Sequence, residues 1–170
     1  GGIAGSAKMP TELEQRWSVW ANIAVGSKGI SYFCYWTPSG GAYNENGFMI
    51  DIEGNQNPMY NWIKQINADI NTIGKKLLPC HADGAIMTST TYYPLYDNNG
   101  TGRSKYGPIQ ALSGSQSVLC GCFRDARRSE NGDNYKGYKA LVMSEFPGRT
   151  INAYLSLDSS ISQITLTHNN

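Results

Sequence analysis

The sequence predicts a chain in two parts: a helix–strand–helix unit of the α/β class over residues 1–80, then an antiparallel all-β sandwich over residues 81–170. Before Pro79, apolar residues recur at helical spacing in two segments, and an aromatic run between them is typical of a strand. After Pro79, short β-type runs alternate with turn clusters, which is the pattern of antiparallel sheets. We therefore expect a domain boundary near residue 80.

The first helix is predicted over residues 11–26 because both of its ends are marked. Thr11 and Glu14 have the spacing of a capping box, and Gly26 is a typical C-terminal cap. Between them, apolar residues recur at helical spacing, and we expect them to pack against other elements: Leu13, Trp17, Trp20, Ala21 and Ala24.

The aromatic run ISYFCYW at residues 30–36 is predicted to be a strand. Its apolar and polar residues do not alternate cleanly, so both faces should be covered, as in a parallel sheet. A parallel strand needs hydrogen-bonding neighbours, yet the sequence supplies no second parallel strand. We therefore expect its neighbours to come from the rest of a longer polypeptide or from a self-associated copy.

A second helix is predicted to begin at Pro58, since proline suits the first helical position. Lys75 and Lys76 near its end suit the negative end of the helix dipole. The loop before it contains a turn in which Asp51 lies close to Gly54. The apolar face of this helix is predicted from residues spaced by three and four: Met59, Ile63, Ile66, Ile70, Ile73 and Leu77.

The second part of the chain should contain several short strands. The charged segment 124–128 is expected to be a solvated loop between two of them. The predicted strands cover residues 86–93, 117–123, 138–146, 150–157 and 162–167.

Composition excludes several function classes. With 14 Lys+Arg against 13 Asp+Glu the net charge is +1, which offers no basic surface for nucleic acid. No apolar run approaches the roughly 20 residues that span a bilayer. The four cysteines and two histidines lack metal-site spacing, so we expect no metal, no cofactor and buried thiols, with a Cys34–Cys80 disulfide left open.

Residues 20–38 and 47–60 resemble the end of TIM-barrel glycoside hydrolases, in particular family 42 β-galactosidases and related bacterial enzymes. In that family a "yGaKGi" motif feeds an eighth strand ending in an aromatic "YF-YW", and this sequence reads VGSKGISYFCYW. The family's following "d-dGnpt-lY" is matched by DIEGNQNPMY. Residues 117–125 and 138–143 resemble, more loosely, the β-sandwich that often follows the barrel.

The resemblance implies that residues 1–80 are the terminal αβα unit of a (β/α)₈ barrel and that residues 81–170 are a β-sandwich domain. It implies the C-terminal portion of a secreted, periplasmic or cell-surface glycoside hydrolase of bacterial type, acting on oligo- or polysaccharide. Such hydrolysis needs two carboxylates, and the resemblance places both upstream, so this chain alone should lack the acid/base and the nucleophile. A non-catalytic carbohydrate-binding or surface β-sandwich module is the alternative.

Trp36 is the main substrate-binding candidate, with Tyr35 beside it. Trp36 would lie at the C-terminal end of its strand, where barrel sites form, and a flat indole suits the apolar face of a sugar ring. Packing at the barrel mouth is the alternative role for both residues, and for Tyr32. The acidic residues of the following loop are expected to be solvated or turn-forming: Glu45, Asp51 and Glu53.

Overall fold

The computed structural model describes residues 9–38, 48–88, 106–125 and 137–167 of the 170-residue chain. These residues form two helices and two antiparallel sheets, one of three strands in the order β1-β3-β4 and one with β2 beside β5. The described structure is thus mixed α/β, and its strands do not close a barrel. The elements are α1 (Glu12–Ala24), α2 (Pro58–Leu77), β1 (Cys80–Met87), β2 (Ile109–Gly114), β3 (Val118–Asp125), β4 (Lys139–Ser144) and β5 (Ala153–Leu157).

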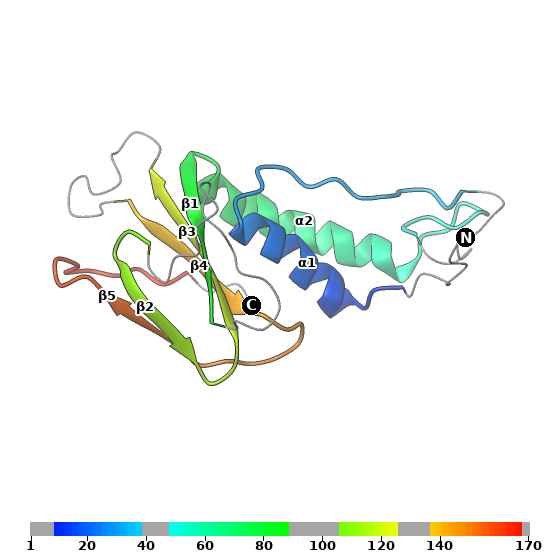
Figure 1. The fold of residues 1–170 in the computed structure, drawn as a ribbon. Helices are drawn as coiled ribbons and strands as arrows, with labels where there is room; N and C mark the ends of the chain where they lie inside the picture. Colours follow the sequence, from blue (N-terminus) through cyan, green and yellow to red (C-terminus); the bar gives the residue numbers. More distant parts are fainter. Residues whose placement is uncertain (1–8, 39–47, 89–105, 126–136, 168–170) are drawn as a thin grey trace, which may run out of the picture.

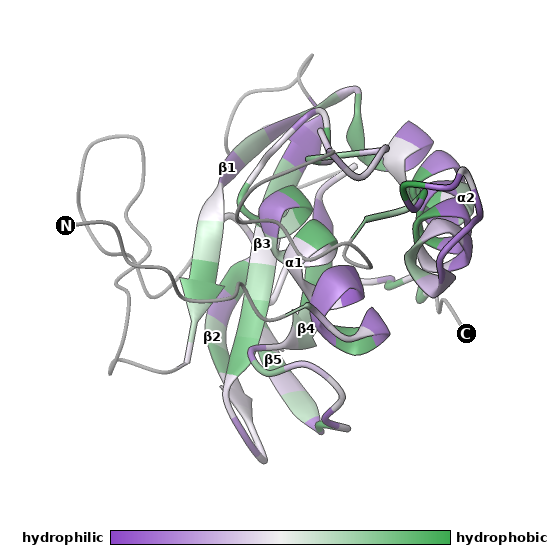
Figure 2. Ribbon diagram, turned by 90° about the vertical axis from the view of Figure 1, so that its right-hand side faces the viewer, coloured by the Kyte–Doolittle hydropathy of each residue, from purple (hydrophilic) through white to green (hydrophobic). Residues whose placement is uncertain are grey.

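The elements are arranged in three layers. Figure 1 shows the two helices on one side of the three-stranded sheet and the pair β2–β5 on its other side. One hydrophobic cluster joins the helices to Cys80 and Phe123 of the sheet, and a second joins the sheet to Ile109 and Leu155 of the β2–β5 pair. In Figure 2 the hydrophobic colouring runs along β1 and β3, between these layers. The helices therefore share a core with the sheet across residue 80.

Strand β3 is central because both of its faces are covered. Cys120 and Cys122 face the second cluster, whereas Phe123 belongs to the first, and all three side chains are fully buried. Residues that alternate along a strand point to opposite faces, so a strand covered on both sides is apolar throughout. This explains the apolar run at residues 117–123. All four cysteines are free, and Cys34 alone among them is only partly buried.

The two predicted helices are confirmed. Thr11 caps α1 through the expected capping box, in which its side chain accepts from the Glu14 N–H and the Glu14 carboxylate accepts from the Thr11 N–H. Pro58 is the first residue of α2. The buried side chains of α2 are Ile63, Ile66 and Leu77.

The strand predicted over residues 30–36 is wrong. The segment runs beside the helices in an extended course, outside either sheet (Figure 1). Among the described residues its ladder contact is a single parallel bridge between Trp36 and Ile50. A strand needs hydrogen-bonding neighbours along its length, and the described part of the chain supplies one only at this end. The helix–strand–helix order is therefore a helix–extended segment–helix order.

Four of the predicted strand segments overlap strands of the structure, namely β1, β3, β4 and β5. Strand β1 begins at Cys80 and not at Ile86, because a bulge between Ala82 and Gly84 breaks the period-two pattern that sequence reading relies on. Residues 89–93, the rest of that predicted strand, lie outside the described ranges. Residues 162–167 form no strand.

Strand β2 has no counterpart among the predicted strands. Its residues 109–114, IQALSG, are short and half-exposed, so their hydrophobic signal is weak. They pair with β5, and the register matches Leu112 to Leu155. The β2–β5 pair covers the outer face of β3, which the sequence pattern alone did not assign to any partner.

We predict that Gly121→Ala destabilises the fold by about 2–3 kcal/mol, because a Cβ at this position would lie 2.2 Å from the carbonyl oxygen of Ala24. Helix α1 would have to move off the sheet. The measurement is the midpoint of urea unfolding. Gly29→Ala is the matched control, since nothing lies within 4 Å of its added methyl group. Equal midpoints for the two variants would show that the helix does not pack this closely on β3.

Candidate functional site

The extended segment meets the loop before α2 at the end of the helix pair that points away from the sheets (Figure 1). Aromatic residues from both segments make ring contacts there. The rings of Phe33 and Phe48 meet edge to face with centroids 6.2 Å apart, and those of Tyr35 and Tyr60 do so at 6.4 Å. Tyr35 is 56% exposed and Trp36 is 52% exposed. We call these residues the aromatic cluster: Phe33, Tyr35, Trp36, Phe48 and Tyr60.

The main chain of Ile50 holds the cluster in place. Its N–H donates to the carbonyl of Tyr35 at 2.9 Å, and its carbonyl accepts from the Thr37 N–H at 2.9 Å and from the Thr37 hydroxyl at 2.6 Å. Thr37 is fully buried, so its hydroxyl needs such a partner. Trp36 lies between two residues that are both bonded to Ile50. Its backbone is therefore fixed while its indole faces solvent.

A turn beside Trp36 is organised by Asp51. The Asp51 carboxylate accepts from the Asn55 N–H at 2.7 Å and from the Asn55 side-chain amide at 3.1 Å. Gly54 has a φ of +90°, which few other residues adopt, and a Cβ there would be 3.6 Å from the indole of Trp36. Asp51 is therefore a turn residue, as the sequence predicts, and its turn places Gly54 next to the indole.

The same hydrogen bonds lower the pKa of Asp51. Desolvation acts to raise this pKa, but the bonds from Asn55 and from the backbone of Glu53 and Gly54 together outweigh it. The carboxylate is thus held ionised by its own turn, which does not suit a group that must donate a proton. Glu53 is exposed, and Glu45 lies outside the described residues.

The two predicted binding residues, Trp36 and Tyr35, are both exposed at the surface. Tyr32, the third aromatic residue considered, has a different environment: its hydroxyl donates to the Asn67 side chain of α2 at 2.9 Å, and burial raises its pKa. Sequence reading missed Phe33, Phe48 and Tyr60. The available signal was the repetition of aromatic residues on both sides of the loop.

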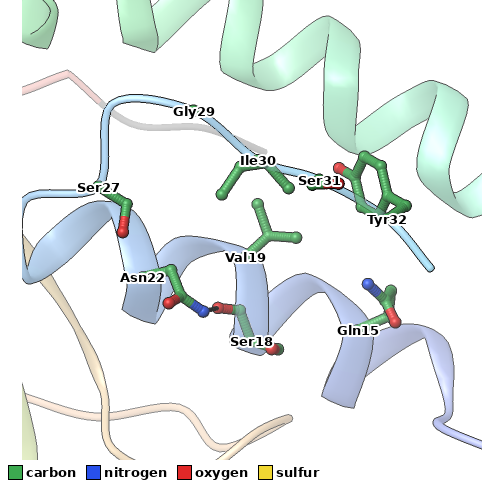
Figure 3. A pocket seen from close by; sticks show the side chains of 9 residues that line it. All are labelled: Gln15, Ser18, Val19, Asn22, Ser27, Gly29, Ile30, Ser31 and Tyr32. Atoms are coloured by element: carbon green, nitrogen blue, oxygen red, sulfur yellow. Dashed lines mark hydrogen bonds between the residues drawn. The ribbon is translucent and has the colours of Figure 1, made fainter.

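A polar hollow of about 190 Å³ lies between α1 and the start of the extended segment (Figure 3). Val19 and Ile30 face each other within it, and the Asn22 side chain donates to the Ser18 carbonyl at 2.8 Å. The remaining lining consists of neutral groups, without a side chain that could supply charge for proton transfer or metal binding. The lining residues are Gln15, Ser18, Val19, Asn22, Ser27, Gly29, Ile30, Ser31 and Tyr32.

A partly buried ion pair lies on the face of the three-stranded sheet that points away from the helices. Arg124 pairs with Asp83 at 2.7 Å, and the Tyr138 hydroxyl donates to the same carboxylate at 3.4 Å. Burial is the main cause that raises the pKa of Tyr138. The expectation that residues 124–128 are solvated is thus wrong at Arg124, because the bulge in β1 turns Asp83 toward it; residues 126–128 lie outside the described ranges.

The pKa of the Cys122 thiol, on the same side of the sheet, is also raised. A hydrogen bond with Cys120 is the first cause at Cys122, followed by burial. Within the described ranges, no three His, Cys, Asp or Glu side chains gather to hold a metal ion. Neither described helix has the length and apolar composition needed to cross a membrane.

Comparison with known protein families, curated proteins and solved structures found no match to this chain. Its function is therefore argued from the aromatic cluster and from the chemistry of the described side chains.

We predict that the Asn55 amide signal follows the ionisation of Asp51 with a midpoint below the ordinary pKa of an aspartate. The hydrogen bonds favour the ionised form, so they stabilise the turn above the ordinary pKa and are lost as the pH falls through the lowered pKa. The measurement is a pH titration by amide NMR. The Asn55 signal of Asp51→Asn should show no such step, and a wild-type midpoint at or above the ordinary value would contradict the turn geometry.

Proposed function

We propose that this chain is the C-terminal portion of a glycoside hydrolase acting on oligo- or polysaccharide, in which Trp36 and Tyr35 contact the sugar. The observation that carries the proposal is the aromatic cluster: two large aromatic side chains exposed to solvent on a backbone that hydrogen bonds hold in place. An exposed group of aromatic side chains on a fixed backbone suits a binding surface.

The chemistry of the cluster fits a neutral carbohydrate. The faces of a pyranose ring carry C–H groups, and these pack well against the electron-rich face of an indole. Tyr35 and Tyr60 add phenol hydroxyls next to this apolar surface. Near the cluster, the ionised carboxylate of Asp51 is engaged with Asn55, so the surface offers apolar contact and hydroxyl groups more than charge.

The catalytic carboxylates are proposed to lie upstream of this chain. Glycoside hydrolysis requires an acid and a second carboxylate on opposite sides of the bond. Four described aspartates instead have structural partners, which support a role in folding: Asp51 with Asn55, Asp69 with Arg16, Asp83 with Arg124, and Asp158 with the Ser160 N–H. We expect the acid and the nucleophile on other strands of a complete barrel.

The extended segment at residues 30–36 supports the view that the chain belongs to a larger fold. Over most of its length it has no ladder partner among the described residues. In the complete protein, neighbouring strands from the rest of the polypeptide or from a second copy would cover this segment.

We predict that Trp36→Ala weakens binding of an oligosaccharide about tenfold, because it removes the stacking surface. The measurement is affinity electrophoresis through gels that contain a panel of soluble polysaccharides. Tyr154→Ala is the matched control: Tyr154 is 63% exposed but lies on β5, in the layer furthest from the cluster. If both variants bind as the wild type does, or if no polysaccharide retards the wild type, the cluster is not a carbohydrate site.

We also predict that the 170-residue chain alone does not hydrolyse nitrophenyl glycosides, because the acid and the nucleophile are proposed to be upstream. Release of nitrophenol is followed by absorbance with a panel of sugars. Turnover that survives purification and is lost in Asp51→Asn would contradict this prediction. It would indicate that the Asp51 carboxylate takes part in catalysis.

The alternative, a non-catalytic carbohydrate-binding module, shares the expected binding by Trp36. The gene sequence upstream separates the two. A glycoside hydrolase requires about seven further strand–helix units, with an acidic residue at the end of two of the strands. A binding module does not require them.

A further inference from the structure

We propose that Cys80 and Lys139 form an oxidation-dependent sulfur–nitrogen cross-link that ties β1 to β4. The Lys139 Nζ atom lies 3.2 Å from the Cys80 Sγ atom, which places an amine in direct contact with a thiol. Both groups are nucleophiles, and neither is used by the proposed carbohydrate site. The pair is therefore a candidate modification site, independent of that function.

The sheet register brings the two residues together. Lys139 of β4 lies opposite Phe123 of β3, and Phe123 lies opposite Ala82 of β1. Cys80 is two residues before Ala82, on the same face of β1, since side chains along a strand alternate. Both side chains thus reach across β3 on the face that the helices cover.

The Cys80 thiol and the Lys139 amine each have few other polar contacts. Cys80 is 4% exposed, and its thiol donates to the Lys76 carbonyl at 3.5 Å. Apart from the sulfur, Lys139 contacts the Gly137 carbonyl at 3.3 Å, and it has no carboxylate partner among the described residues. The Lys28 ammonium binds the Cys80 carbonyl at 2.5 Å, which fixes the cysteine backbone.

The other buried thiols lack this arrangement. Cys120 and Cys122 lie on the opposite face of β3, in an apolar cluster where their thiols contact each other and backbone carbonyls. Cys34 is more accessible, but its thiol donates to the Trp36 carbonyl at 2.8 Å and not to an amine. Contact with a lysine amine therefore distinguishes Cys80.

The reaction uses hydrogen peroxide as the oxidant. The Cys80 sulfur, as thiolate, attacks one peroxide oxygen, the O–O bond breaks, and the sulfur becomes a sulfenic acid while the other oxygen leaves as water after protonation. Lys139 then loses a proton, and its amine attacks the sulfenyl sulfur. The S–O bond breaks, the S–N bond forms, and a second water leaves. One thiol, one amine and one peroxide thus give one sulfenamide and two waters.

The test treats the full chain with hydrogen peroxide and maps it by tryptic digestion and mass spectrometry without a reductant. The expected product is a peptide containing Cys80 joined to one containing Lys139, two hydrogens lighter than the sum of the two. Trypsin should no longer cut after Lys139, because its amine is substituted. Dithiothreitol should restore both peptides. The cross-link should also raise the midpoint of thermal unfolding by on the order of 10 °C, since it closes a long loop.

Matched variants separate this chemistry from general oxidation. Lys139→Arg keeps the positive charge but lacks the nucleophilic amine, so the linked peptide should disappear. Cys34→Ser removes a more accessible thiol and should leave the linked peptide unchanged. The proposal is overturned if Lys139 stays cleavable in the oxidised wild type while Cys80 is recovered as a free thiol, as a disulfide or as a sulfinic acid.

Discussion

The fold depends on the burial of β3 between two layers. Its Gly121 lets the backbone of α1 approach at Ala24, so the helix pair packs directly on the sheet. On the other face, Cys120 and Cys122 fill the space beneath the β2–β5 pair. Large side chains at these positions would separate the layers, because protein interiors tolerate little added volume. Three layers are thus held together through one strand of small and apolar residues.

Sequence reading succeeded where a local rule decides the structure. The capping box at Thr11 and the apolar spacing in α2 depend on neighbours within a few residues, and both helices form as expected. It failed where the outcome depends on distant partners. The aromatic run at 30–36 has the composition of a strand, but composition cannot supply hydrogen-bonding neighbours. Asp83 was not associated with Arg124, because a bulge set their pairing and bulges leave little trace in a sequence.

The candidate site was predictable only in part, for the same reason. Trp36 and Tyr35 were chosen because they end a predicted strand; that strand does not form, although both side chains are exposed. The ring partners Phe48 and Tyr60 come from beyond the loop, so their positions follow from the fold. The Cys80–Lys139 contact spans 59 positions of sequence, as the numbering shows, and arises from the order of three strands. Such contacts require the sheet register to be known.

At this end of the molecule, main-chain hydrogen bonds to Ile50 hold the aromatic residues in place. The groups that hold the fold are therefore different from the side chains that would contact a ligand. A peptide group is the same whatever side chain it carries, so the side chains at 35 and 36 can change without loss of these bonds. Ligand preference can therefore drift by substitution of exposed rings, while the buried Thr37 keeps the loop in register. Among natural variants of this surface, substitutions should be more frequent at the exposed aromatic residues than at Thr37.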